Sequence, residues 1–375
     1  MLYDLSYPGL ANYIPLLSFS PFPLFREPTT VAIVSLMLDT VTDFIDSCSS
    51  CTQCGTVCPF LEIYGSPEDI IANKPQLAFL CTNCTGCDKR CPLELSPSAA
   101  LFETKKRLIT EQRVPEKAAR ALKGAKSFAQ RGHAAPFLRY DSKATVFWPG
   151  CSLAATSPEV VEETRVLLAS ILDEEVGLVL DCCFDPLYQM GDLAPVQEAC
   201  DRIRERISDA GIENLIVGCV NCRKVFQRHM EGVNVRHIVE VLPDDILKTV
   251  PDEDLYLHHP CPHYHVEGIE DKTRSLLANA LADEVDEQRI PACCGLGGNL
   301  NNQDLELAMK FTERVTMAAY GASIVTACMG CKNTFLKKGT HTYHILELIT
   351  GVEPKTKPVG MARKWANRLL LAKGK

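Results

Sequence analysis

The sequence predicts a multidomain α+β fold, in which a small helical domain rich in cysteine is followed by two repeated α/β units. The cysteines between Cys48 and Cys91 form two runs of equal spacing, separated by segments with a helical pattern. After Ala144, short apolar strands alternate with longer helices, which is typical of α/β layers. This order of elements occurs twice, with an offset of about 110 residues.

Six segments follow from these changes of pattern. They are an N-terminal extension, a helical domain, a basic helical linker, the first α/β unit, the second α/β unit and a basic C-terminal tail. Their residue ranges are 1–38, 39–112, 113–144, 145–250, 251–350 and 351–375. With 375 residues and 46% hydrophobic residues, the chain can bury a core in each main domain. Its net charge of -8 gives no general attraction to nucleic acid, which we do not expect as a partner.

The N-terminal extension contains an uncharged stretch from Leu5 to Phe25 that has the length of a membrane span. Four prolines interrupt it, at Pro8, Pro15, Pro21 and Pro23, and each removes a backbone donor that lipid cannot replace. No basic region precedes it, which argues against a signal peptide. We expect an upstream extension of the reading frame, with translation starting at Met37; a membrane anchor and a partner-binding arm are the alternatives.

The helical domain is expected to begin with a short helix after Met37 and to contain helices around residues 67–80 and 97–110. Residues 103–133 then combine good helix formers with many basic side chains. Among the basic residues are Lys105, Lys106, Arg107, Lys117, Arg120 and Lys126. Two interpretations are open for this segment, a solvated linker helix and a docking face for an acidic partner.

The two α/β units are each expected to contain three strands and two helices. In the first unit the strands are predicted at 145–151, 177–183 and 214–219, with helices at 158–175 and 196–210. In the second they are predicted at 254–261, 289–294 and 323–328, with helices at 273–283 and 303–320.

The two N-terminal cysteine runs have the spacing C-x2-C-x2-C-x3-C, and each is followed by proline. Three thiolates on one tight turn can bind three irons of a 4Fe-4S cubane, while the fourth reaches the other cluster. Cluster 1 is therefore assigned to Cys48, Cys51, Cys54 and Cys91, and cluster 2 to Cys81, Cys84, Cys87 and Cys58. Repeated clusters of this kind favour metal ligation over disulfides, in a reducing, low-oxygen compartment. A zinc ribbon would need only pairs of C-x2-C.

Ten further cysteines form two sets of five at the predicted strand ends. The first set is Cys151, Cys182, Cys183, Cys219 and Cys222, and the second is Cys261, Cys293, Cys294, Cys328 and Cys331. The carboxyl ends of parallel strands line a common crevice, so each set should converge. Five thiolates exceed the needs of a cubane, and the adjacent pair can bind neighbouring irons of a distorted cluster. Buried structural thiols and a mononuclear zinc site are the alternatives.

At these cysteines the sequence resembles the paired-cysteine (CCG) family, whose best-known member is the catalytic subunit of heterodisulfide reductase. The resemblance covers roughly residues 40–350, and the N-terminal runs are similar to that enzyme's small ferredoxin-like subunit. It implies two non-cubane 4Fe-4S clusters, cluster 3 on the first set and cluster 4 on the second, with all ten cysteines catalytic in disulfide cleavage. Phe184 replaces the family's glycine after the first pair, whereas Gly295 keeps it. We therefore expect the first site to be less open to a large substrate.

Two functions are compatible with these sites. The first is a heterodisulfide reductase-like oxidoreductase that acts on a small thiol or disulfide within a complex. The second is the electron-transfer subunit of a flavin-dependent glycolate, lactate or glycerol-3-phosphate dehydrogenase complex that feeds quinone or cytochrome. No G-x-G-x-x-G fingerprint is present, so a flavoprotein, hydrogenase or cytochrome b subunit is expected as electron partner. We expect a cytoplasmic protein, with peripheral membrane association only through a partner.

Other residues have two interpretations each. Residues 258–265 place four histidines around Cys261, where they either supply protons or form structural hydrogen bonds. The glycines at 295, 297 and 298 are expected to allow close packing near Cys294 rather than to bind phosphate. Cys200 is expected to be a core residue. The basic C-terminal residues Arg363, Lys364, Arg368 and Lys373 indicate either a solvated tail or an amphipathic helix that touches a membrane partner.

Overall fold

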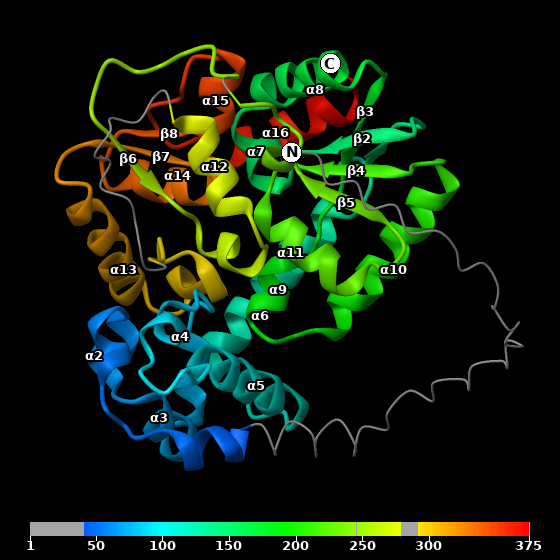
Figure 1. Ribbon diagram of the computed structural model, residues 1–375. Helices are drawn as coiled ribbons and strands as arrows, with labels where there is room; N and C mark the ends of the chain where they lie inside the picture. The colour runs from blue at the N-terminus through cyan, green and yellow to red at the C-terminus, as the bar shows by residue number, and fades with distance from the viewer. Residues whose placement is uncertain (1–40, 245, 279–291, 375) are drawn as a thin grey trace, which may run out of the picture.

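The computed structural model describes residues 41–244, 246–278 and 292–374 (Figure 1). The predicted N-terminal extension lies outside these ranges, as do the end of the helix expected at 273–283 and the first half of the strand expected at 289–294. Within the described ranges the fold is mixed α/β with two small sheets. None of the helices described there has both the length and the apolar character needed to cross a bilayer.

The N-terminal domain consists of short helices joined by cysteine-containing loops, in agreement with the predicted helical segments. Proline begins four of them, where its missing N–H is not needed. The Ser66 hydroxyl caps one, accepting a hydrogen bond from the Asp69 amide at 3.2 Å. The elements are η1 (Gln53–Thr56), α2 (Pro59–Tyr64), α3 (Pro67–Asn73), η2 (Pro75–Leu80), α4 (Gly86–Arg90) and α5 (Pro97–Thr110).

The basic segment at residues 103–133 belongs to two helices rather than one, the end of α5 in the helical domain and α6 (Glu116–Gly132) after it. One face of α6 buries alanines at 118, 121, 125 and 129, while Lys117 and Arg120 are exposed. The prediction of a solvated linker helix is therefore correct for the outer face of α6. It is wrong for Lys105 on α5, which is fully buried. Its ammonium group is satisfied there by three oxygen acceptors, the nearest being the carbonyl oxygen of Cys81 at 2.6 Å.

The first sheet has the strand order β1-β3-β2-β4-β5, with β1 antiparallel and the other four strands parallel. The second has the order β6-β7-β8, all parallel. The strands are β1 (Arg139–Tyr140), β2 (Thr145–Trp148), β3 (Val176–Leu180), β4 (Asn214–Val217), β5 (Asn234–His237), β6 (Leu255–His258), β7 (Ser323–Thr326) and β8 (Thr342–His344). Strands β1, β5 and β8 were not expected, and residues 292–294 of the strand expected at 289–294 are irregular.

Helices cover the sheets and lead the cysteines out of the strand ends. In the first half they are α7 (Cys151–Thr156), α8 (Pro158–Leu172), α9 (Asp185–Gln189), α10 (Ala194–Asp209), α11 (Val220–His229) and η3 (Ile238–Glu240). In the second half they are η4 (Cys261–His265), α12 (Ile269–Leu277), η5 (Gly297–Asn302), α13 (Leu305–Ala318), α14 (Met329–Lys337), α15 (Ile345–Thr350) and α16 (Met361–Ala372).

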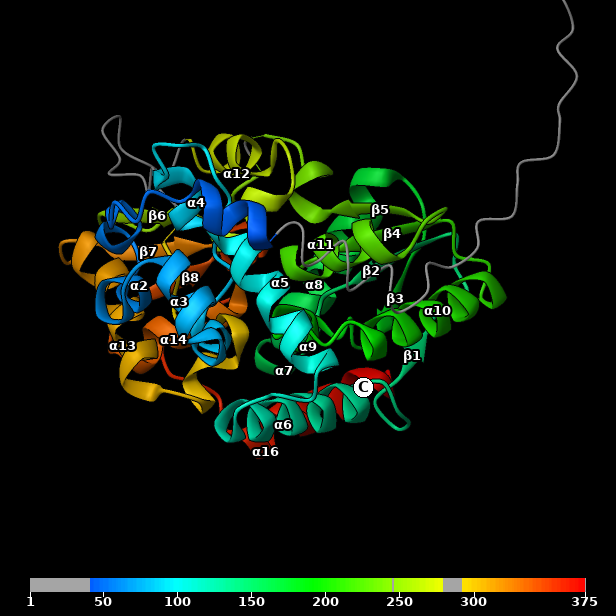
Figure 2. The same cartoon turned by 90° about the horizontal axis from the view of Figure 1, so that it is seen from below.

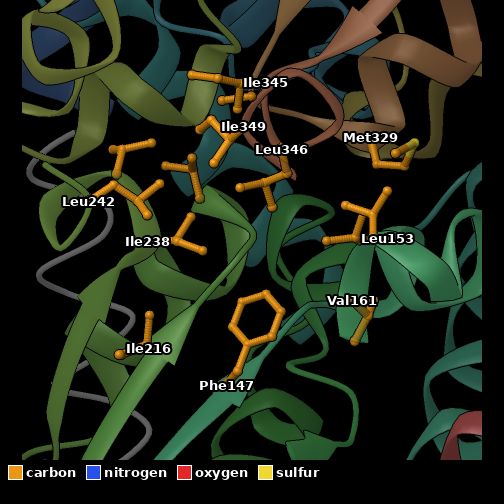
Figure 3. Close-up of a cluster of buried hydrophobic side chains, with 14 of the residues drawn as sticks. Phe147, Leu153, Val161, Ile216, Ile238, Leu242, Met329, Ile345, Leu346 and Ile349 are labelled. Atoms are coloured by element: carbon orange, nitrogen blue, oxygen red, sulfur yellow. The ribbon is translucent and has the colours of Figure 1, made fainter. Parts of the chain in front are cut away.

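The two sheets share one hydrophobic core. Figure 3 shows Phe147 of β2 and Ile216 of β4 on one side of it, with Leu346 and Ile349 of α15 on the other. The helical domain lies below both sheets in Figure 1, and Phe60 of α2 belongs to a second cluster with residues of η5 and α13. The two halves are therefore held face to face, and the helical domain packs on the second half.

The C-terminal segment is not a solvated tail, which corrects that prediction. Helix α16 packs on α7 and lies beside α6 (Figure 2). Trp365 of α16 contacts Phe128 and Phe137, with ring centroids 5.5 and 4.8 Å away. Arg368 is 2% exposed. This aromatic and buried face explains why the basic helix stays on the protein.

Candidate metal centres

Four thiols predicted for cluster 1 surround a small cavity of about 10 Å³. Cys48, Cys51 and Cys54 come from the first run, and Cys91 reaches the cavity from the second. The pKa of Cys54 is raised to about 11, first by burial and then by the negative charges of the other three thiolates. A cationic cluster of irons would remove that repulsion, so the donor set fits iron-sulfur ligation.

The thiols predicted for cluster 2 gather in the same crosswise manner. Burial, followed by the charges of Cys84 and Cys81, raises the pKa of Cys58 well above its usual value. The pKa of Cys87 is likewise raised, first by burial and then by Asp88, Cys81 and Cys58. The last cysteine of each run thus lies with the first three of the other, as the spacing predicted.

A repeated backbone conformation shapes both loops. Ser50 and Thr52 in the first run, and Asn83 and Thr85 in the second, have φ between 50° and 63°. Non-glycine residues adopt this left-handed conformation at a cost of about 1–2 kcal/mol each. Such strain persists where the surroundings require it, and here it turns successive thiols toward one centre.

The first set of five thiols lies at the carboxyl edge of the first sheet. Cys151 begins α7 after β2, the pair Cys182 and Cys183 follows β3, and Cys219 caps α11 after β4. The Cys222 sulfur in α11 lies 3.2 Å from that of Cys183. All five line one cavity of about 170 Å³, so the predicted convergence is confirmed.

Phe184 does not line this cavity, and the expectation that the first site is less open to a large substrate than the second stays a prediction. Its backbone takes the left-handed conformation that a glycine would adopt, with φ 59°. Its side chain is buried away from the cavity lining and packs edge-on against His133 at 5.5 Å between ring centroids. In the second half Gly295 has the same left-handed conformation, with φ 83°, and it is required for a further reason, because a Cβ there would lie 2.3 Å from the Ala308 carbonyl oxygen.

A buried carboxylate behind the first cysteine pair escaped the sequence reasoning. The Asp181 carboxylate accepts hydrogen bonds from the Tyr140 hydroxyl at 2.6 Å and from Arg206 Nη1 at 2.9 Å. It also accepts one from the Cys182 amide at 2.6 Å, and His133 Nδ1 lies 2.6 Å away. This network of hydrogen bonds fixes the backbone at Cys182 and Cys183. The position of an acidic residue directly before these two cysteines was the only local sign of the network in the sequence.

The second set gathers through similar contacts. Cys261 begins η4, Cys328 caps α14, and the Cys331 sulfur lies 3.3 Å from that of Cys294. A hydrogen bond with Cys293, then one with Cys331, lowers the pKa of Cys294 well below its usual value. Cys261 also contacts Cys293, so all five thiols belong to one group.

The second set meets the helical domain through Cys293, whose thiol hydrogen-bonds Cys84. Two glycines after the second pair allow this approach. A Cβ on Gly297 would lie 2.5 Å from the Thr82 carbonyl oxygen, and one on Gly298 would lie 2.7 Å from that of Cys81. The expectation that these glycines serve close packing is confirmed.

Two His-x-x-Glu sequences, which the sequence reasoning also missed, form matching capping boxes after β5 and β8. His237 pairs with Glu240 in the first half, and His344 pairs with Glu347 in the second. Each glutamate also meets the basic residue that follows the last cysteine of its set. Lys332 Nζ lies 2.6 and 2.5 Å from the Glu347 oxygens, fully buried, and Arg223 lies 3.4 Å from Glu240.

The histidines around Cys261 are mostly buried. His258, His259 and His263 have no exposed surface. Burial, then the charges of His237, His259 and His258, lowers the pKa of His263 well below its usual value. Burial lowers the pKa of His265 to about 4. The imidazoles of His263 and His265 are therefore neutral at physiological pH, which argues against imidazolium groups as proton donors. Structural hydrogen bonds are not seen at His263, since neither of its ring nitrogens has a partner among the described residues. Cys200 is a core residue of α10, as predicted.

Within the described ranges, no group of three or more His, Cys, Asp or Glu side chains could hold a single metal ion. Cubane ligands each bind a different iron and therefore lie farther apart than ligands of one ion.

The second cysteine set lies inside the match to a known family. Residues 255–336 match the family model described as the CCG cysteine-rich domain, so the chain contains such a domain, which is consistent with an iron-sulfur redox subunit.

Proposed function

We propose that this protein is the iron-sulfur subunit of a heterodisulfide reductase-like oxidoreductase. Two 4Fe-4S cubanes in the helical domain would pass electrons to two non-cubane clusters on the five-cysteine sets, where a disulfide is reduced or two thiols are oxidised. The observation that carries the proposal is the cavity of about 170 Å³ lined by the whole first set and by Cys328 of the second. A cluster that only relays electrons needs four thiolates, whereas this cavity is lined by five from the first set and by a sixth from the second.

The order of the thiol groups supports a route for electron transfer, written here for the reduction of a disulfide. Cys51 is exposed and Cys48 and Cys91 are half-buried, so cluster 1 would accept electrons from a partner. Cys84 of the second group contacts Cys293, which would bring electrons to the second set. Cys328 lines the cavity of the first set, so the two sets would act on one substrate.

The chain's own groups have defined tasks in this proposal. When bound, iron-sulfur clusters supply one-electron transfer, and reduction of one disulfide consumes two electrons and two protons. Asp181 and its donors hold the Cys182 backbone in place. The buried pair of Lys332 and Glu347 fixes α14, which carries Cys331.

The proposed partners follow from the missing components. A flavoprotein, hydrogenase or cytochrome b subunit would supply or accept electrons at the exposed side of cluster 1. The complex would be cytoplasmic, touching the membrane only through that partner.

Iron analysis and anaerobic EPR test the function. We expect about sixteen irons per chain, and a new paramagnetic signal when oxidised protein meets small thiols. Cys331→Ser should abolish that signal, whereas Cys200→Ser, at a buried thiol outside all four groups, should retain it. About eight irons per chain would remove the reactive sites. Full iron content without any thiol-dependent signal would instead favour the electron-transfer subunit of a flavin-dependent hydroxy-acid dehydrogenase complex.

A further inference from the structure

A second cavity, of about 100 Å³, lies where α16 packs on α7 beside the first cysteine set. Its polar and charged lining includes Cys151, Ser152, Lys364 and Arg368, and Phe128 and Trp365 form aromatic walls. No carboxylate belongs to this lining. Two cations face a single thiol, Cys151, in a partly enclosed space, and such an excess of positive charge is typical of an anion site.

Arg368 is the strongest evidence for such a ligand. Its side chain is 2% exposed, and Nη2 donates to the Gly132 carbonyl oxygen at 3.2 Å. Nε and Nη1 are buried without an oxygen or nitrogen acceptor among the described residues, although the side chain also forms a hydrogen bond with the Cys151 sulfur. Buried guanidinium groups usually have all their donors satisfied. Nε and Nη1 together carry three N–H groups, and the Cys151 sulfur cannot accept from all of them, so an acceptor is missing.

The guanidinium is held in place by its neighbours. It stacks on Trp365 at 5.3 Å from the ring centroid. A Cβ on Gly132 would lie 2.9 Å from Arg368 Nη1, so only glycine leaves room for it there. The nearby Cys151 has its pKa lowered to about 7, first by a hydrogen bond with Cys182 and also by the charge of Arg368.

Lys364 adds a second positive charge to the same cavity. Burial, then the charge of Lys337, lowers the pKa of Lys364. A bound anion would offset the repulsion between these ammonium groups. The cavity has room for a few water-sized groups, which suits a carboxylate or sulfonate rather than a nucleotide.

This cavity adjoins the larger one on the first cysteine set, because Phe128, Cys151 and Ser152 line both. We propose that it binds the acidic group of a small anionic thiol or disulfide, whose sulfur then lies in the larger cavity. The inference rests on the proposed function for the role of the sulfur, but the anion site itself does not depend on redox chemistry. A guanidinium and an ammonium group together select acids over neutral thiols.

Calorimetric titration of the anaerobically purified full chain tests the site. The probes are mercaptoacetate, its neutral analogue 2-mercaptoethanol, and propionate, which has no thiol. We expect mercaptoacetate to bind about tenfold more tightly than 2-mercaptoethanol. Lys364→Met should remove most of that preference, while Arg363→Met, at an exposed residue of the same helix, should leave it unchanged. Arg368→Lys retains a charge and should weaken mercaptoacetate binding while the protein stays folded.

The outcomes separate this inference from the proposed function. Equal affinities for mercaptoacetate and 2-mercaptoethanol, or equal effects of the Lys364 and Arg363 variants, would overturn the anion site, and Arg368 would then only compensate the charge of Cys151. Lys364-dependent propionate binding without any thiol-induced EPR signal would support the site and overturn the redox role. A thiol-induced EPR signal without any preference for acidic thiols would support the redox role and overturn the anion site.

Discussion

Replacing Glu347 by glutamine tests the buried ion pair that joins α14 to α15. Glu347 and Lys332 are 1% and 0% exposed, and the ammonium group lies 2.6 and 2.5 Å from the two carboxylate oxygens. The same carboxylate accepts the His344 amide at 2.8 Å. Glutamine keeps the shape but leaves the ammonium group buried without a counter-charge. Loss of one member of a buried pair costs about 3–5 kcal/mol of unfolding free energy.

The matching position in the first half provides the control. Glu240 occupies the same place in its capping box, but it and Arg223 are partly exposed and 3.4 Å apart. Glu240→Gln should therefore cost about 1 kcal/mol or less. Urea denaturation under anaerobic conditions, at matched iron content, measures both. Lys332→Met combined with Glu347→Gln should recover part of the loss, because no buried charge remains. Equal destabilisation by the two single variants would refute the reasoning.

Three further predictions concern the first half and the contact with the helical domain. Asp181→Asn should lower the unfolding free energy by about 2 kcal/mol in chemical denaturation, since a buried charge-assisted network is lost, whereas Glu175→Gln at an exposed surface pair should change it by less than about 1 kcal/mol. Gly298→Ala should lower the melting temperature more than Gly211→Ala; both have positive φ, but only the first Cβ would meet a carbonyl oxygen, at 2.7 Å, and equal shifts would contradict the close packing. Burial, then the charge of Arg223, lowers the pKa of His237 to about 3 from 6.5. The unfolded chain therefore binds more protons between these values, stability should fall as pH drops below about 6.5, and His237→Asn should flatten that dependence in melting curves between about pH 5 and 7.

The cysteine groups were predictable because their geometry is largely local. Three thiols on one tight turn face the same way, and Cys58 and Cys91 exchange places between the runs as the spacing implied. The main helices of the helical domain and the strands β2, β3, β4, β6 and β7 also followed from pattern and capping. Their ligation of iron stays a prediction, and the family match shows only that the second set lies in a CCG cysteine-rich domain.

Several features could not be read from local pattern. The short strands β5 and β8 are partly polar and lie at sheet edges, so they lack a strong apolar signal. Lys105 and Arg368 have the side chains of solvated residues, yet both are buried by segments distant in the chain. The role of Asp181 depends on Tyr140 and Arg206, which approach it only in the folded protein.

The sequence by itself determined which thiols form each group, since spacing along a turn or after a strand dictates where each sulfur points. Tertiary structure alone decided how the groups face one another, with Cys84 against Cys293 and Cys328 beside the first set. It also placed the guanidinium of Arg368 next to Cys151. These contacts join residues far apart in the chain, and their free energy comes from packing and from desolvated charges, which no local pattern of residues records.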